Sequence, residues 1–432
     1  MKNRIISLIL FVAMLNSSAL VFSETEEAIP VALNLDVILL DAVQRNPDIL
    51  AAKADWLAMI KRVWIDSSLP DPMGGYDIMG AMTETRLGPQ KNRFMISQEV
   101  PFPLKLVAKG KMANDEARAA YQRYLAVARD VANQLTKLYD ELYFIDASLE
   151  TLDSVKGLLK RFEQVAQSRY SNMSGEQRDV AKAQAEVSMS LEKIYMLKRD
   201  REIVAAMINA LLDRDPMLPV GKASRPPSPV LSKSLIDLVN LAVQNRQEIK
   251  EMEALASKSR RAKTLAKLAY IPDINVGFEY TRVGSGSTEM PPDMDGRDSW
   301  MFPVRFNIPL WQNRIIPEIQ EAKSRAEADE KRLLGVKNKT FYEVKEAFHR
   351  YKNSTEVAGL YETAVIPQAE LALSADQAGY EAGKTDFLNL LDSERVYLNA
   401  KLSHIQFFTE ALKAYADLVR ATGLDFEGGN ES

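Results

Sequence analysis

The 432-residue chain contains an internal repeat, in which residues of the first half recur in the second half at a nearly constant separation. The separation is 200 residues at the start of the two copies and drifts to 210 near their ends. The matching pairs include Leu35 and Leu235, Ala42 and Ala242, Ile49 and Ile249, Pro70 and Pro272, Phe94 and Phe302, and Tyr170 and Tyr380. Because a repeat constrains the architecture before any motif is considered, we expect a pseudo-twofold protomer of two interlocked halves, each of about 190 residues. Such a protomer would act through an assembled shape and not through a catalytic cleft.

The N-terminus has the pattern of a secretory signal peptide over residues 1–23. Lys2 and Arg4 precede an apolar run at residues 5–15, and we expect cleavage after Ser23. A retained membrane anchor is the alternative, but the apolar run is short for a membrane span. The chain contains no cysteine, so we expect an exported protein without disulfides and without a lipid anchor.

The rest of the chain divides at a proline-rich stretch. Residues 213–230 contain five prolines among polar residues, and we interpret them as a linker. The first repeat then covers residues 24–212, the second covers 231–424, and residues 425–432 are expected to be a disordered tail. The predicted fold class is mainly α with a small β part, because each repeat combines long coiled-coil helices with one β-hairpin.

Very long helices are predicted in both repeats. No proline occurs between Leu104 and Asp215, and strong helix formers fill this stretch. Apolar residues there alternate at spacings of four and three, the heptad pattern of a coiled coil: Val131, Leu135, Leu138, Leu142, Ile145, Leu149 and Leu152. The other expected features are a turn at residues 171–175, helices over 33–66 and 231–269, and helices over 315–422 with a kink at Pro367 and a turn near Gly383.

Four short segments alternate apolar and polar residues, as β-strands with one apolar face do. They cover residues 76–87 and 92–101, joined by a turn at 88–91, and residues 273–284 and 299–310. A soluble sheet with one buried face gives the same alternation as transmembrane strands of about ten residues. The export signal, and the lack of a nearby partner sheet, favour membrane strands. Because four strands cannot close a barrel and an open edge in lipid leaves backbone groups unpaired, several chains must then share one barrel.

The second repeat contains a segment that resembles the TolC-type outer-membrane efflux proteins. The segment runs from Tyr380 to Asp392 and is followed by Ala-Thr-Gly at residues 421–423. The first repeat matches more weakly around Tyr170 and Gly175. The resemblance implies a homotrimer whose 12-stranded β-barrel in the outer membrane is continuous with a periplasmic α-helical barrel. It further implies a passive exit duct of a tripartite efflux system, working with a periplasmic adaptor and an inner-membrane pump.

The resemblance also assigns roles to residues near the two helix turns. Asp392 and Asn389 correspond to positions that narrow the pore entrance, and a ring of Asp392 carboxylates would attract cations. Asn389 lacks the carboxylate of its family counterpart, which leaves cation selectivity open. A solvated helix residue is the alternative for Asp392. The turn residues Gly383, Lys384, Thr385, Gly175 and Glu176 are the expected adaptor contacts, with ordinary inter-helix turns as the alternative.

The remaining residues offer little support for catalysis or for a cofactor. The two histidines are far apart in sequence, and no catalytic or phosphate-binding motif is present. Several of the 17 methionines lie near the hairpins. Thioethers there suit either a Cu(I) site or the packing of apolar surface, and we predict no metal site. The mildly acidic composition excludes a nucleic-acid partner. A soluble periplasmic coiled-coil scaffold or adaptor is the alternative function, and the exported substrate stays open among drugs, metal ions and polypeptides.

Overall fold

A computed structural model describes residues 32–80, 83–286 and 293–423. The predicted signal peptide, at residues 1–23, and the predicted tail, at residues 425–432, lie outside the described residues. The chain forms two compact units. The first unit contains the chain up to Ala52, Tyr124–Gln247 and the chain from Lys337; the second contains Lys53–Arg123 and Glu248–Val336. Each unit therefore takes segments from both sequence repeats.

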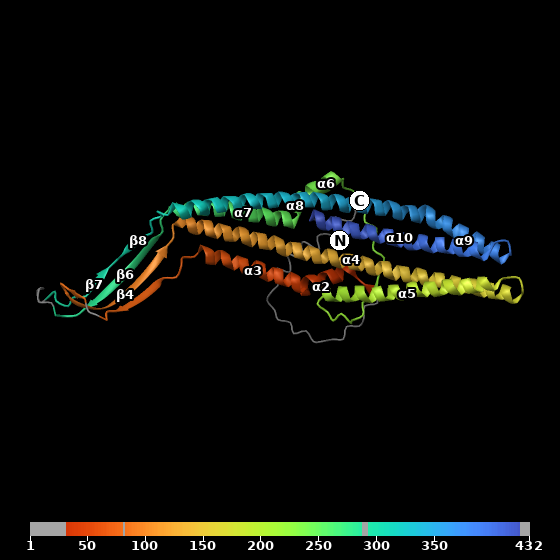
Figure 1. Cartoon of the computed structure of the whole chain (residues 1–432), viewed down its shortest axis with the longest axis horizontal. Helices are drawn as coiled ribbons and strands as arrows, with labels where there is room; N and C mark the ends of the chain where they lie inside the picture. The colour runs from red at the N-terminus through yellow and green to blue at the C-terminus, as the bar shows by residue number, and fades with distance from the viewer. Residues whose placement is uncertain (1–31, 81–82, 287–292, 424–432) are drawn as a thin grey trace. The chain divides into compact units, whose positions relative to one another are not determined.

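Long helices dominate the structure, as predicted (Figure 1). They are α4 (Pro103–Ser171), α5 (Gln177–Leu211), α8 (Gln312–Leu360), α9 (Ile366–Glu381) and α10 (Phe387–Thr422). The 69 residues of α4 confirm the predicted helix, and the turns after Ser171 and Glu381 lie where the sequence places them. The predicted interruption at Pro367 takes the form of a π-helical turn, η2 (Tyr361–Val365), just before it. No helix in the described ranges is long and apolar enough to cross a membrane.

The shorter helices show the repeat most clearly. They are α2 (Leu35–Arg45) and α3 (Pro47–Ser67) in the first copy, and α6 (Leu235–Asn245) and α7 (Gln247–Lys267), followed by the 3-10 helix η1 (Leu268–Tyr270), in the second. The bounds of α2 and α3 recur in α6 and α7 at a separation of 200 residues. The side chains of Ile38, Ala42 and Ile49 are buried, as are their counterparts in the second copy.

The prediction of single helices over 33–66 and 231–269 was wrong, because each is broken in the middle. Asn46 leaves the helical conformation, with ψ at 123°, and its side-chain oxygen accepts the Ile49 N–H at 3.1 Å. Pro47 follows it and cannot supply the N–H that a continuous helix needs. In the second copy Arg246 is extended at the same place and forms an ion pair with Glu343 at 2.5 Å.

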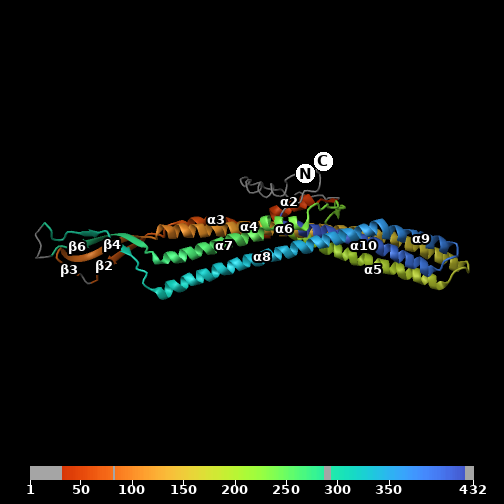
Figure 2. The same cartoon turned by 90° about the horizontal axis from the view of Figure 1, so that it is seen from above.

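The second unit contains an antiparallel sheet (Figure 2). Its strands are β2 (Met73–Ile78), β3 (Glu84–Thr85), β4 (Gly88–Val100), β6 (Ile274–Val283), β7 (Ser299–Met301) and β8 (Val304–Phe306). The order is β2-β4-β6, after which β7 and β8 both pair with β6. The β4–β6 pair joins the two repeats, with Ile96 opposite Phe278 and Ser97 opposite Gly277.

Two details of the predicted hairpins were wrong. The first turn does not lie at 88–91, because Gly88 begins β4 and the turn lies at Arg86 and Leu87. Gly88 has a φ of +122°, and a Cβ there would lie 2.0 Å from the Gly284 carbonyl oxygen, so only glycine fits. The expected strand at 299–310 is split into β7 and β8 at Phe302 and Pro303 and ends at Phe306, since proline lacks a ladder donor.

The predicted linker contains a strand that the sequence does not reveal. In the first unit, β5 (Lys222–Ala223) pairs in parallel with β1 (Ala32–Leu33). The Tyr139 hydroxyl of α4 lies 2.9 Å from the Ser224 Oγ and donates to the Leu33 carbonyl oxygen at 3.3 Å. Two residues are too few for an alternation pattern, so sequence periodicity could not indicate this pairing.

Candidate functional site

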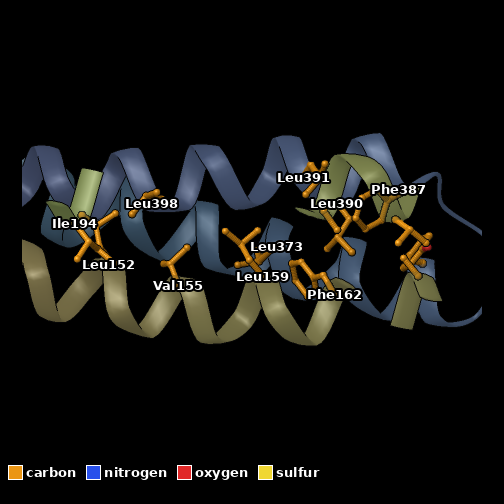
Figure 3. Close-up of a cluster of buried hydrophobic side chains, with 14 residues drawn as sticks. Leu152, Val155, Leu159, Phe162, Ile194, Leu373, Phe387, Leu390, Leu391 and Leu398 are labelled. Atoms are coloured by element: carbon orange, nitrogen blue, oxygen red, sulfur yellow. The ribbon is translucent and has the colours of Figure 1, made fainter. Parts of the chain in front are cut away.

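The turns between the long helices lie at one end of the first unit, and a shared apolar core holds their helices together (Figures 1 and 3). We call residues 172–176 and 382–386 the tip turns, and the buried cluster beneath them the tip core. The tip core draws on α4, α5, α9 and α10, and comprises Leu152, Val155, Leu159, Phe162, Ala166, Val180, Ala183, Ile194, Leu373, Tyr380, Phe387, Leu390, Leu391 and Leu398. Leu152 belongs to the predicted heptad series, so the coiled-coil pattern extends into this core.

Arg169, near the end of α4, links the two tip turns. Its Nη1 donates to the carbonyl oxygen of Tyr380, and its Nη2 donates to the carbonyl oxygen of Ser174 at 3.3 Å. Its guanidinium carbon also lies 4.7 Å from the centroid of the Tyr380 ring. That ring packs in turn against Phe387, with centroids 5.1 Å apart. One cation thus fixes both reversals of the chain, and the aromatic pair spans the second turn.

The two tip turns have the same backbone hydrogen bonds. The N–H of Ser174 bonds to the Arg169 carbonyl at 2.9 Å, and the N–H of Lys384 bonds to the Gly379 carbonyl at 2.8 Å. This six-to-one bond is typical of a helix that ends with a left-handed residue. In the second turn that residue is Gly383, with a φ of +72°, as the sequence predicts.

The first turn has a non-glycine residue in the left-handed conformation. Met173 and not Gly175 takes the positive φ, at 56°, and its side chain is 97% exposed. Gly175 is required for a different reason, because a Cβ there would lie 2.9 Å from the Cβ of Arg169. The Met173 backbone thus takes a conformation that disfavours a side chain, at a corner of the turn where this side chain contacts little of the described chain.

Two carboxylates and one hydroxyl give the tip its electrostatic character. Burial, and secondarily the nearby Asp386, raise the pKa of Asp179. Burial, and secondarily Asp179, raise the pKa of Tyr380. The Tyr380 hydroxyl oxygen is buried and has no hydrogen-bond partner within the described chain.

The predicted entrance residues lie together on one helix face. Asn389 and Asp392 are three residues apart on α10, and both are exposed. Lys384 and Glu176 are exposed in the tip turns, while Thr385 is partly buried. Glu176 also pairs with Arg178 at 2.8 Å. The structure thus places all the predicted residues in or near the tip turns of one chain.

One buried acidic pair was missed by the sequence analysis. Glu394 of α10 is 1% exposed, and Glu186 of α5 is buried beside it and accepts a hydrogen bond from Arg395. A signal was present in the sequence, because Glu394 falls at a helical spacing between Leu390 and Leu398 where an apolar residue is expected. Among the described residues no group of three or more His, Cys, Asp or Glu side chains could hold a metal ion.

The sheet of the second unit has one apolar face and one polar face. Apolar side chains on one face are exposed in the chain: Tyr76, Ile78, Phe94, Ile96, Ile274, Val276, Phe278, Trp300, Val304 and Phe306. Ile96 is 53% exposed and Phe306 63%. The other face is polar, with Arg305 bonded to Glu279 at 2.6 Å. The alternation predicted for the strands is thus present, and the apolar face lacks a cover within the described chain.

The comparisons with known proteins agree with this geometry. Residues 238–424, from α6 to the end of α10, match the family described as Outer membrane efflux protein. This match covers the second repeat and confirms the resemblance seen in the sequence. The matching family is one of efflux proteins and not of enzymes.

Solved channels share the fold over nearly the whole chain. The outer-membrane channel OprN is 19% identical with a TM-score of 0.76, over 91% of this chain and 90% of that one. The outer membrane protein VceC of Vibrio cholerae is 17% identical with a TM-score of 0.75, over 91% and 97%. CusC, whose structures concern folding and transmembrane channel formation, is 14% identical with a TM-score of 0.78, over 93% and 96%. No curated protein matches the chain.

Proposed function

We propose that the protein is the outer-membrane exit duct of a tripartite efflux system, a passive trimeric channel for small molecules or ions. The observation that supports this most is the sheet with one exposed apolar face in a chain that carries an efflux protein domain. In a soluble protein such a face would be covered by other parts of the chain, whereas in a membrane it would be covered by lipid. The alternative, a soluble periplasmic scaffold, does not account for this face.

The sheet explains why the duct would be a trimer. Its outer strands, β2 on one side and β7 with β8 on the other, leave edge groups unpaired within one described chain. An unpaired edge in lipid costs several kcal/mol for each unsatisfied group. Three copies placed edge to edge would close a barrel of twelve strands, with the polar face and the Glu279–Arg305 pair lining the lumen.

The tip would form the periplasmic entrance of the duct. Asp392 and Asn389, exposed on one face of α10, would narrow the pore when three copies assemble. The turn residues Gly383, Lys384 and Thr385 in one turn, and Gly175 and Glu176 in the other, would contact the periplasmic adaptor. The inner-membrane pump would deliver the cargo. This placement requires an outer-membrane location and export, for which residues 1–23 are the expected signal peptide.

The oligomeric state and the detergent requirement test this proposal together. We expect the purified mature chain to need detergent for solubility and to have three times the protomer mass by light scattering. The unheated trimer should also migrate differently from the heated chain on a denaturing gel. A monodisperse, detergent-free monomer with intact helicity would instead support the scaffold.

A further inference from the structure

Helix α10 buries an acidic side chain that has no role in the duct as described so far. Glu394 lies one helical turn from both Leu390 and Leu398 of the tip core, and 1% of its surface is exposed. Its Oε1 is buried and makes no hydrogen bond within the described chain. An ionised carboxylate without a partner at such a site would be costly, so the geometry favours the neutral, protonated acid.

A second carboxylate faces Glu394 from the neighbouring helix. Glu186 of α5 is 9% exposed and already accepts a hydrogen bond from Arg395 Nη2, so its charge is compensated. Lys193 of α5 is the other cation that acts on Glu394. On the side of α9, Asp376 accepts a hydrogen bond from Ser393. The members of the tip core on α4 and α5 are apolar.

These surroundings place the titration of Glu394 close to neutral pH. Burial, and secondarily the Glu186 carboxylate, raise the pKa of Glu394 from 4.5 to about 7. The packed arrangement therefore holds a proton that a solvated Glu394 would release. Because packing raises this pKa, the packed arrangement is most stable below pH 4.5, loses stability as the pH rises, and is least stable above about pH 7.

We propose that Glu394 and Glu186 form a proton latch between α5 and α10, which keeps the tip closed while Glu394 is protonated and loosens it when the proton leaves for solvent. The proposal rests on the proposed duct function, because it regulates the entrance of that duct. Loss of the proton breaks the Glu394 O–H bond and leaves a second negative charge beside Glu186. Repulsion and desolvation then favour separation of the two helices, which lets water reach the carboxylate.

Single-channel recordings across a pH series test the latch. The purified trimer is inserted in a planar bilayer, and the open probability is measured between about pH 5.5 and 8.5. We expect it to rise through about pH 7, with the ratio of open to closed states changing by up to about tenfold per pH unit for each proton linked. E394Q mimics the protonated acid, so this variant should stay closed and lose the pH dependence.

Two further variants make the test specific. E186Q removes the Glu186 charge, which raises the pKa of Glu394, and frees Arg395 to neutralise Glu394. The pH-dependent transition should therefore move to lower pH. The control E192Q removes an exposed carboxylate of α5 and should behave as the wild type. A wild type with constant open probability, or an E394Q variant that keeps the full pH dependence, would overturn the latch while the duct stands.

An infrared measurement separates failure of the latch from failure of the duct. Difference spectra of the folded trimer in detergent should show a protonated carboxyl band that disappears through about pH 7 and is absent in E394Q. If no variant ever conducts but the band is present, the duct function fails and the buried proton remains. If the band is absent from the wild type, the latch is refuted whatever the channel does.

Discussion

At the level of single residues, the tip turns depend on two glycines for different physical reasons. Gly383 supplies a left-handed conformation, with a φ of +72°, whereas Gly175 supplies space beside Arg169. A side chain at the first position costs backbone strain of about 1–2 kcal/mol. A side chain at the second must displace the α4 end that carries the Arg169 link to Tyr380.

We therefore expect G383A and G175A to lower the midpoint of thermal unfolding of the trimer. Each substitution should cost at least about 1 kcal/mol of stability. The control is G157A, at an exposed position inside α4 where an added Cβ meets nothing within 4 Å. It should stabilise by about 0.5–1 kcal/mol, because alanine favours a helix over glycine. Equal effects for all three substitutions, measured by circular dichroism, would contradict this account of the turns.

Asp392 is the residue on which the entrance hypothesis depends most. We expect D392N to reduce the preference for cations, because it removes one ring of three carboxylates. Reversal potentials in a salt gradient measure the selectivity. E192Q serves as the control for a general loss of negative charge. An unchanged reversal potential would show that Asp392 is only a solvated helix residue.

At the level of elements, the sheet gives the sharpest prediction, because neighbouring residues of β4 face opposite sides. Ile96 is exposed on the apolar face, whereas Ser97 faces the polar side opposite Gly277. The chain has no cysteine, so single cysteines can be introduced without background. In proteoliposomes, S97C should react with a membrane-impermeant maleimide and I96C should be protected.

The same two variants provide the control for this experiment. Both cysteines should react equally after denaturation in detergent, which shows that protection depends on the lipid. If I96C reacts as fast as S97C in intact proteoliposomes, the apolar face is not in contact with lipid and the sheet is not a membrane barrel.

The elements that the sequence predicts well are those with long, regular patterns. The heptad series and the absence of proline predict α4. The separation of 200 residues between the repeats is also the separation between the bounds of α2 and α3 and those of α6 and α7. The break at Arg246 could not be predicted, because no proline or glycine marks it and a tertiary ion pair with Glu343 accompanies it. The turn before Gly88 was misplaced because glycine suggests a turn, whereas here a close approach of Gly284 requires it.

The predicted site residues form only part of what the tip contains. Asp392, Asn389 and the tip turns lie at one end of the first unit, and their roles stay predictions. The link from Arg169 to Tyr380 could not be predicted, because it joins residues 211 positions apart in sequence. Glu394 could have been noticed, since it interrupts an apolar series, but its partner Glu186 lies on another helix.

At the level of the whole molecule, the repeat and the open sheet lead to the same conclusion. Each compact unit draws on both repeats, so neither repeat forms a unit of its own. The sheet in turn is incomplete in one chain, because its edge strands and its apolar face have no cover in the described residues. In the proposed duct, other copies of the chain and lipid would supply that cover.

Ion conductance of the purified mature protein in a planar lipid bilayer tests the central claim most directly. For the duct, we expect discrete, long-lived channel events at protein concentrations at which a control porin also inserts. A protein that is folded by circular dichroism and that never inserts or conducts under those conditions would contradict the duct and favour the periplasmic scaffold.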